Sequence, residues 1–424
     1  MSFPQTFRLK QRFHADRVAD ISSTVTDQVR RLNIDGKVKA GQTVAITAGS
    51  RGIANIAEVL AAVAQSIKDR GARPFIFPAM GSHGGATAEG QRHVIESYGV
   101  TEEYCGCEIR SSMETVTIGD SPDGYPVHFD KHAYEADHIL ICNRVKVHTD
   151  FTGRVQSGLI KMMLIGCGNR NGAYLYHRAT EEFGFDHMAE NNVPLVLENC
   201  NVLGGIAIVE NGYDEIGLIE AVPVEQIIDR EPALLKLSAE WMPRLPFPEC
   251  DVLVLDEIGK NISGTGMDTN VVGRKYREHA AVDGEVPKVK RIAVRGLSEA
   301  THGNALGIGL SEFCRTRVLE EMDPDSTRVN SLTSGRLPLA MKPVDFATDK
   351  EMLAAALKTI GLVPPERAGL IWAHNTLELS ELECSERWLD EAHQREELEV
   401  VSQLRELPFD PTGNLPSVTS GWTP

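Results

Sequence analysis

The chain has 424 residues, of which 42% are hydrophobic and 24% charged, as in soluble globular proteins that are too long for a single ordinary core. The formal net charge of -17 and the lack of basic runs mixed with aromatic residues argue against a nucleic-acid partner. No apolar run approaches the roughly 18 residues of a membrane span, the N-terminus lacks a signal core, and the eight cysteines follow no disulfide spacing, so we expect a cytoplasmic protein.

The first part of the chain alternates short apolar segments with stretches of helical periodicity. In chain order, these predict an edge strand at residues 3–10, a helix at 16–32, a strand at 42–48, a helix at 53–68, a strand at 75–80 and a helix at 88–98. Glycine-rich turns follow both of the later strands. Two successive strand–turn–helix units predict a parallel, doubly wound sheet, in which ligands bind at the carboxyl ends of the strands.

A third buried strand is predicted at residues 139–142. Lys146, His148 and Asp150 then alternate along the chain, so they would share one face if the strand continued. Lys161 follows as a single charged residue inside an apolar segment. Burying an ammonium group is costly unless the group is paired, neutralised or chemically used, so this lysine is the most unusual residue of the stretch.

The remaining elements complete the first domain and predict a second domain of the same class. Before three prolines between residues 243 and 248, we expect short side strands at 108–118 and 126–129, a β-hairpin at 195–210 and a helix at 224–240. After the prolines, we expect strands at 251–255, 290–296 and 368–373, helices at 311–321 and 349–360, and an irregular tail from residue 408. The chain is therefore predicted to form two α/β domains with mainly parallel sheets, residues 1–245 and 246–424, with the active site in the cleft between them.

Arg51 and His83 each follow a predicted strand in a turn that contains glycine. Arg51 would hold a carboxylate or an oxyanion, or it is a surface arginine at the start of a helix. His83 stands in GSHGGAT, where the glycines let the backbone approach a ligand closely and Thr87 is expected to cap the next helix. The imidazole would act as a general acid or base, or would make a structural hydrogen bond in the turn.

Three further residues extend this pattern along the chain. His148 would be a second acid or base, or a metal ligand. Lys161 either anchors a ligand or reaches solvent from an amphipathic helix. His177 would be a ligand, or a packed ring between Tyr174 and Tyr176. Each structural alternative is acceptable by itself, but their joint occurrence at successive strand ends and glycine turns favours a functional site.

Two other motifs give weaker signals. Cys105 and Cys107 form a CxC pair, but the second pair that a structural zinc site needs is missing. In the second domain, the polar and glycine-rich segment EIGKNISGTGMD follows a predicted strand. Its Lys260, Asn261 and Asp268 would close over a substrate, or would cap the next helix.

The candidate residues of the first domain resemble the nickel-dependent lactate racemase family, a group of 2-hydroxyacid racemases and epimerases. The resemblance spans residues 47–177 and, weakly, the second domain. It is carried by Arg51, His83, His148, Lys161 and His177. The sixteen-residue interval from Lys161 to His177 agrees with the family. The longer interval between His148 and Lys161, and Gly84 after the histidine of the glycine-rich turn, indicate a divergent subgroup.

The resemblance implies a cofactor, the nickel-pincer nucleotide (pyridinium-3,5-bisthiocarboxylic acid mononucleotide nickel). It also implies that Lys161 is the covalent attachment point, that His177 is the protein ligand to nickel, and that Gly84 and Ser157 lie against the cofactor. Proteins that mature the cofactor are the implied partners. An imidazole suits Ni(II) in square-planar geometry, and a lysine that loses its proton through burial can be acylated.

The implied activity is inversion of C2 of a small 2-hydroxy acid. The C2 proton is barely acidic, whereas removal of a hydride to the cofactor gives a planar keto acid that can take the hydride back on either face. His83 and His148 then form an acid/base pair for the hydroxyl proton, and Arg51 or Lys260 holds the substrate carboxylate. The chain is thus expected to be an isomerase whose second domain closes over the substrate.

Two alternatives stay open. The chain would be a divalent-metal-dependent lyase or dehydratase if His83, His148 and His177 ligate a first-row metal ion. It would be a non-catalytic carboxylate-binding protein if the site is degenerate. Turnover with a simple divalent metal ion, or binding without turnover, would distinguish these alternatives from a racemase.

Overall fold

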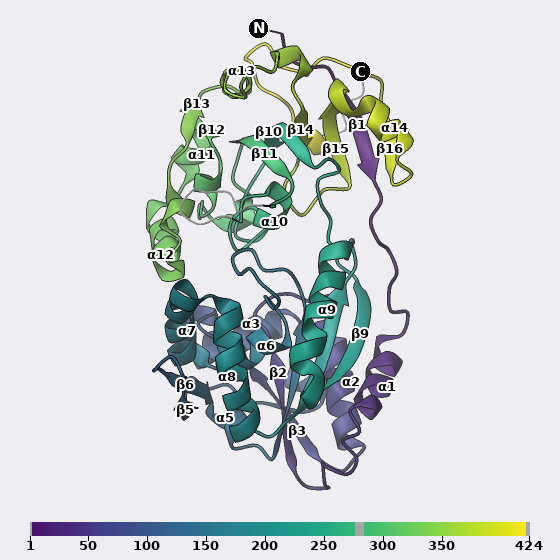
Figure 1. The fold of residues 1–424 in the computed structure, drawn as a ribbon, viewed down its shortest axis with the longest axis vertical. Helices are drawn as coiled ribbons and strands as arrows, with labels where there is room; N and C mark the ends of the chain where they lie inside the picture. Colours follow the sequence, from purple (N-terminus) through teal and green to yellow (C-terminus); the bar gives the residue numbers. More distant parts are fainter. Residues whose placement is uncertain (1, 276–283, 421–424) are drawn as a thin grey trace. The chain divides into compact units, whose positions relative to one another are not determined.

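The chain divides into two compact units, which Figure 1 shows as ribbons. The computed structural model describes residues 2–275 and 284–420. The N-terminal unit is His14–Met242, and the C-terminal unit joins Met1–Phe13 to Pro243–Pro424. Both units are α/β with large, mainly parallel sheets, as the sequence predicts. The predicted active site in a cleft between them stays a prediction.

The start of the chain belongs to the C-terminal unit, so its predicted place in a domain of residues 1–245 is wrong. Strand β1 (Thr6–Gln11) pairs antiparallel with both β15 (Glu381–Ser385) and β16 (Leu398–Val400). It is therefore not an edge strand either. Hydrogen bonding to strands more than 370 residues away along the sequence decides this placement, and no local pattern in the first residues could have indicated it.

The N-terminal unit contains a six-stranded sheet that is parallel except for its last strand. In spatial order its strands are β4 (Glu108–Ile109), β3 (Arg73–Pro78), β2 (Thr43–Ala48), β7 (His138–Arg144), β8 (Val202–Glu210) and β9 (Ile216–Pro223). The central strands are buried over most of their length, as expected for a parallel sheet that is covered on both faces.

Alternate residues of these strands enter two separate apolar cores. In β7, Ile139 and Ile141 belong to one core, whereas Leu140 and Cys142 belong to the other. The helices of this unit are α1 (Ile21–Arg31), α2 (Ile56–Lys68), α3 (Ala88–Ser97), α4 (Glu102–Cys105), α5 (Lys131–Tyr134), α6 (Leu159–Lys161), α7 (Asn169–Phe183), α8 (Phe185–Asn199) and α9 (Ile227–Trp241). A separate two-stranded sheet consists of β5 (Thr115–Asp120) and β6 (Pro126–Asp130).

Two predicted elements are wrong in kind. The segment 195–210 is not a hairpin: its first residues end helix α8, and the hairpin is formed by β8 and β9. Val193 and Val196 of α8 are buried in the core, and this packing keeps the segment helical despite its β-branched residues. The predicted helix at 311–321 begins instead with strand β12 (Phe313–Arg315), which pairs with β11.

The C-terminal unit is built on an eight-stranded sheet (Figure 1). In spatial order its strands are β13 (Val344–Phe346), β12, β11 (Lys288–Val294), β10 (Glu249–Leu255), β14 (Leu370–Ala373), β15, β1 and β16. The first five are parallel, and the last three alternate in direction. Its helices are α10 (Thr269–Val272), α11 (Thr316–Glu321), α12 (Pro324–Ser334), α13 (Asp349–Lys358) and α14 (Leu389–Gln394). None of the helices in the described part of the chain is long and apolar enough to cross a membrane.

Candidate active site

Three adjacent parallel strands, β2, β3 and β7, bring their carboxyl ends to one edge of the N-terminal sheet. Arg51, His83 and His148 lie in the loops that follow these three ends. In doubly wound sheets, the loops that follow the carboxyl ends of neighbouring parallel strands form the ligand-binding site. The topology therefore places residues that are far apart in the sequence in neighbouring loops.

The loop after β7 differs from its prediction. Strand β7 ends at Arg144, and Lys146 then forms a single antiparallel bridge with Ser157. The chain turns between these two residues, so Lys146, His148 and Asp150 do not share one strand face. The turn returns the backbone to the start of α6, the short helix that ends at Lys161.

Phe151 lies at the centre of this loop, where three candidate residues meet. Its ring stacks on the ring of His148, with centroids 4.1 Å apart and 16° between the planes. On the same ring, the Nζ atom of Lys161 is 5.3 Å from the centroid, and the centroid of His177 is 6.4 Å away. Phe185 of α8 also stacks on Phe151, at 4.7 Å. Phe151 was not among the predicted site residues, and its position three residues after His148 was the only signal.

The amine of Lys161 is held in an unusual state. The residue is half-buried at the end of α6, and a π-helical turn, Met162–Gly166, follows it. Burial first, and the positive charge of Arg51 second, lower the pKa of Lys161 to about 7. Within the described residues its amine has no hydrogen-bond or ion-pair partner. A large fraction of the amine is therefore neutral and nucleophilic at neutral pH.

Two further site residues share this electrostatic environment. Desolvation, with a second contribution from the charge of Lys161, lowers the pKa of His177 on α7. The pKa of Arg51 is also lowered, first by desolvation and in part by the nearby charge of Arg144. Arg51 makes no ion pair within the described part of the chain. A neutral imidazole suits a metal, and the guanidinium of Arg51 suits an anionic ligand.

The glycine-rich turn holds His83 through its backbone. Nδ1 of His83 is 2.9 Å from the carbonyl oxygen of Met80. Gly84 has φ +64°, and a Cβ atom there would lie 2.5 Å from the backbone nitrogen of Gln91, so only glycine fits. The side chain of Gln91, which is fully buried, donates a hydrogen bond of 2.9 Å to the carbonyl oxygen of Gly81. The turn is thus folded back on α3.

The same turn is tied to both its helix and the lysine segment. Thr87 caps α3, as predicted, because its Oγ1 accepts a hydrogen bond of 3.1 Å from the backbone of Gly90. The backbone N–H of Gly81 donates to the carbonyl oxygen of Gly166, at 3.2 Å, in the π-helical turn after Lys161. The loop that carries His83 therefore lies directly beside the segment that carries Lys161.

Glu231 of α9 positions the lysine helix. Its side chain is fully buried, and its Oε2 accepts a hydrogen bond of 2.9 Å from the backbone of Ile160. The backbone of Leu159 also donates to it, so Glu231 caps the start of α6. A Cβ atom at Gly158 would lie 2.5 Å from this carboxyl group, so glycine is required there. Glu231 was not among the predicted site residues, because it lies 70 residues beyond Lys161 in the sequence.

Replacing Glu231 by glutamine is expected to change how stability depends on pH. Burial raises the pKa of Glu231 from 4.5 to about 7, so the folded state holds a proton that the unfolded chain releases. The stability from this proton is complete below the unfolded pKa and is lost as the pH rises through about 7. The free energy of unfolding of Glu231→Gln, measured with guanidinium, should therefore decline less between about pH 5 and pH 8 than that of the wild type.

Two variants make the Glu231 experiment decisive. Glu231→Ala leaves the amides of α6 unpaired and should cost about 1–3 kcal/mol. Glu225→Gln, on an exposed side chain near the start of the same helix, serves as the control and should keep the wild-type pH profile. An unchanged pH profile in Glu231→Gln would show that the titrating group lies elsewhere.

Part of the chain is similar to a known protein family. Residues 6–183 match the model of the lactate racemase N-terminal domain family.

This part of the chain is similar to the N-terminal domain of lactate racemases.

A solved structure, the lactate racemase apoprotein from Thermoanaerobacterium thermosaccharolyticum, has the same fold. The alignment covers 87% of this chain and 94% of that chain, with a TM-score of 0.53 and 14% sequence identity. At this identity the likeness shows the fold alone. No curated protein sequence matches the chain. The matched residues include Arg51, His83, His148, Lys161 and His177.

The predicted substrate residues lie in the C-terminal unit, outside the matched lactate racemase domain. The amine of Lys260 donates a hydrogen bond of 2.6 Å to the carbonyl oxygen of Gly264, and Oδ1 of Asn261 accepts one of 2.5 Å from Ser298. Asp268 is buried and caps helix α10. For Asp268, the structure therefore supports the capping alternative, whereas Lys260 and Asn261 remain predictions as substrate residues.

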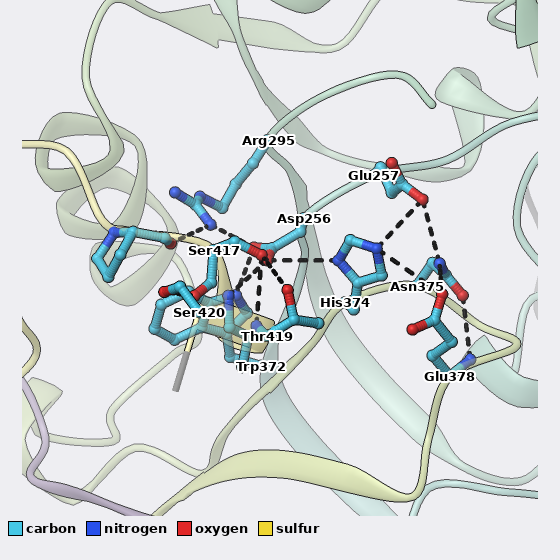
Figure 2. A network of polar contacts seen from close by, with 12 residues as sticks. Asp256, Glu257, Arg295, Trp372, His374, Asn375, Glu378, Ser417, Thr419 and Ser420 are labelled. Atoms are coloured by element: carbon cyan, nitrogen blue, oxygen red, sulfur yellow. Dashed lines mark hydrogen bonds and ion pairs between the residues drawn. The ribbon is translucent and has the colours of Figure 1, made fainter. Parts of the chain in front are cut away.

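A second polar cluster follows the carboxyl ends of three strands in the C-terminal unit and was missed by the sequence analysis (Figure 2). Asp256 comes directly after β10, Arg295 directly after β11 and His374 directly after β14. Asp256 accepts hydrogen bonds from Arg295 and, at 2.6 Å, from the indole of Trp372. Figure 2 shows His374 between Asp256 and Glu257, with nitrogen–oxygen distances of 3.7 and 3.3 Å.

The C-terminal tail is part of this cluster. Ser417 and the backbone of Val418 donate hydrogen bonds of 3.0 and 2.7 Å to Asp256. The tail thus lies over the carboxyl edge of its own sheet, the position that ligands take in other doubly wound sheets. These hydrogen bonds to Asp256 therefore anchor the tail to its own sheet (Figure 2).

The remaining candidate motif, CxC, shows no sign of reactivity. Burial raises the pKa of the thiols of Cys105 and Cys107 to about 11, so both are protonated at neutral pH. Among residues 2–275 and 284–420, no group of three or more His, Cys, Asp or Glu side chains is arranged to hold a metal ion. A metal ion held by one histidine and by a cofactor attached to a lysine would not need such a cluster of side chains.

Proposed function

We propose that the chain is a racemase or epimerase that inverts C2 of a 2-hydroxy acid. The observation that carries the proposal is the half-buried amine of Lys161, which has a pKa of about 7 and contacts Phe151. A structural lysine would be paired or would reach solvent, whereas an amine kept neutral by burial suits covalent attachment. The lactate racemase domain at residues 6–183 supports the same activity.

The side chains around Lys161 fit the nickel-pincer nucleotide. Lys161 would carry the cofactor through a thioamide, and His177 would ligate nickel through its imidazole, whose pKa desolvation lowers. Gly84 and Ser157 would lie along the cofactor. When bound, the cofactor supplies the hydride acceptor that inversion at C2 needs. The proteins that build this cofactor are the proposed partners of the chain.

The chain's own residues would orient the substrate and move its hydroxyl proton. Arg51, which has no ion-pair partner in the described part of the chain, would bind the substrate carboxylate. His83 and His148 would face the substrate hydroxyl group from either side, so that its proton can be taken and returned. Lys260 and Asn261 of the C-terminal unit would close over the substrate. Oxidation to a planar keto acid and reduction on the other face would then invert C2.

The test is to produce the chain together with cofactor-maturation proteins. We expect intact-mass analysis to show an added mass, peptide mapping to place it on Lys161, and metal analysis to find bound nickel. The loaded protein should interconvert the enantiomers of at least one member of a panel of 2-hydroxy acids, followed by chiral chromatography. The same protein produced without the maturation proteins is the control and should be inactive.

Two outcomes would overturn the proposal. Activity that appears with a simple divalent metal ion and without added mass would favour a lyase or dehydratase that uses His83, His148 and His177. Binding of hydroxy acids without turnover by the loaded protein would favour a carboxylate-binding protein. Each outcome would leave the fold and family assignment of residues 6–183 unaffected.

A further inference from the structure

His83 and His148 use their Nδ1 atoms in opposite ways. Nδ1 of His83 is 2.9 Å from the carbonyl oxygen of Met80. A carbonyl oxygen can only accept, so Nδ1 of His83 carries the proton. Nδ1 of His148 lies 3.1 and 3.0 Å from the backbone nitrogens of Asp150 and Phe151, which can only donate. Nδ1 of His148 therefore carries the lone pair.

A neutral imidazole has one proton, so the state of Nδ1 determines the state of Nε2. In His83, Nε2 has the lone pair and can accept a proton. In His148, Nε2 has the proton and can only donate a hydrogen bond. The stacking of His148 on Phe151 and the hydrogen bond of 2.8 Å from its backbone to Gln156 hold this ring in place.

We infer that the two histidines are not interchangeable: His83 is the base that takes and returns the substrate hydroxyl proton, and His148 is a hydrogen-bond donor to the substrate oxygen. This inference rests on the proposed function. A second proton on His148 would have to sit on Nδ1, against two backbone N–H groups, and both hydrogen bonds would be lost. By contrast, protonation of His83 keeps its bond to Met80 and strengthens it, because the donor becomes charged.

The proton and electrons balance with one base. The hydroxyl O–H bond breaks, its proton goes to Nε2 of His83, and its electron pair forms the C2=O double bond, while the C2 hydrogen leaves as hydride to the acceptor that the bound cofactor would supply. The Nε2–H of His148 stabilises the negative charge that develops on the oxygen. Inversion then comes from reorientation of the planar keto acid before the hydride returns, with His83 giving back the same proton.

The first test reads the tautomers directly and needs no cofactor. The apoprotein labelled with nitrogen-15 on histidine is studied by NMR at an alkaline pH, where both rings are neutral. The signals are assigned with His83→Gln and His148→Gln. We expect a protonated Nδ1 in His83 and a protonated Nε2 in His148. The same tautomer in both rings would overturn the inference, whether or not the protein is a racemase.

The second test uses the loaded enzyme and a glutamine at each position, because the glutamine amide can donate a hydrogen bond but cannot act as a base. With a 2-hydroxy acid that the wild type racemises, His83→Gln should lose at least ~10²-fold in kcat. His148→Gln should keep kcat within roughly tenfold, whereas His148→Ala should lose about 10²-fold.

Equal losses in the two glutamine variants would overturn the inference and leave the proposed function standing. Absence of turnover in the wild type would overturn the proposed function and, with it, the catalytic roles, while the tautomers would still be read by NMR.

Discussion

Replacing Lys161 by methionine is expected to abolish turnover and, at the same time, to stabilise the apoprotein. Methionine has a similar length but offers no amine for attachment, so racemase activity should fall at least ~10³-fold. Folding lowers the pKa of Lys161 from 10.5 to about 7, so at neutral pH the folded state is penalised relative to the unfolded chain. Without this penalty, the free energy of unfolding should rise by about 1–3 kcal/mol near pH 7.

The gain in stability should depend on pH. Between the two pKa values of Lys161, about 7 and 10.5, the unfolded chain binds a proton that the folded state does not. The stability of the wild type therefore increases with pH in this interval, and the advantage of Lys161→Met shrinks. Guanidinium unfolding at about pH 7 and about pH 9.5 measures the difference.

Two comparisons isolate the role of the Lys161 amine. Lys161→Arg keeps a positive charge but cannot form the thioamide, so it should be inactive without the gain in stability. Lys146→Met removes another half-buried lysine of the same loop and should show no comparable pH-dependent gain. A Lys161→Met protein that racemises its substrate at the wild-type rate would refute covalent attachment at this residue.

Replacing Asp349 by alanine is expected to be the most destabilising single change in the C-terminal unit. Its carboxylate is fully buried and accepts hydrogen bonds of 3.0 Å from Arg295 and 2.8 Å from the backbone of Leu415. Arg315, which is also buried, pairs with it at 2.8 Å. Removing one partner of a buried charge network leaves the others uncompensated and should cost about 3–5 kcal/mol. Guanidinium unfolding followed by tryptophan fluorescence measures this loss.

The pH dependence gives the Asp349 network a second signature. Burial works to raise the pKa of Asp349, but Arg295 and Arg315 outweigh it, and the pKa lies below the usual 3.8. The stability contributed by this carboxylate is therefore complete above that usual value and is lost as the pH falls below it. Asp325→Ala, which removes an exposed ion pair to Arg328, is the control and should change stability by no more than about 0.5 kcal/mol. Equal losses in the two variants would refute the role of the network.

Local patterns predicted the elements that surround the site. The strands β2, β3 and β7 have apolar runs followed by turns, and these features depend on neighbouring residues only. The positions of Arg51, His83 and His148 after those strands follow from the same patterns. The cap at Thr87 was also predictable, because a cap depends on the first turn of its own helix.

Other features depend on tertiary packing and were predicted wrongly or missed. Strand β1 was assigned to the wrong domain, because its pairing partners lie near the other end of the chain. Helix α8 was taken for part of a hairpin, because its β-branched residues favour a strand unless the core packs against them. Glu231 has an ordinary helical context in the sequence, and only its contact with Ile160 shows its role.

The sequence by itself determined that Lys161 is an exceptional lysine, since a charge inside an apolar segment is visible without coordinates. The tertiary structure decided what surrounds that lysine: Phe151 beneath the amine, Glu231 at the start of its helix and Arg51 near enough to lower its pKa. It also decided the tautomers of His83 and His148, which depend on backbone groups of the folded loops. A side chain's identity is a local property, but its proton affinity depends on burial and on charges brought close by folding.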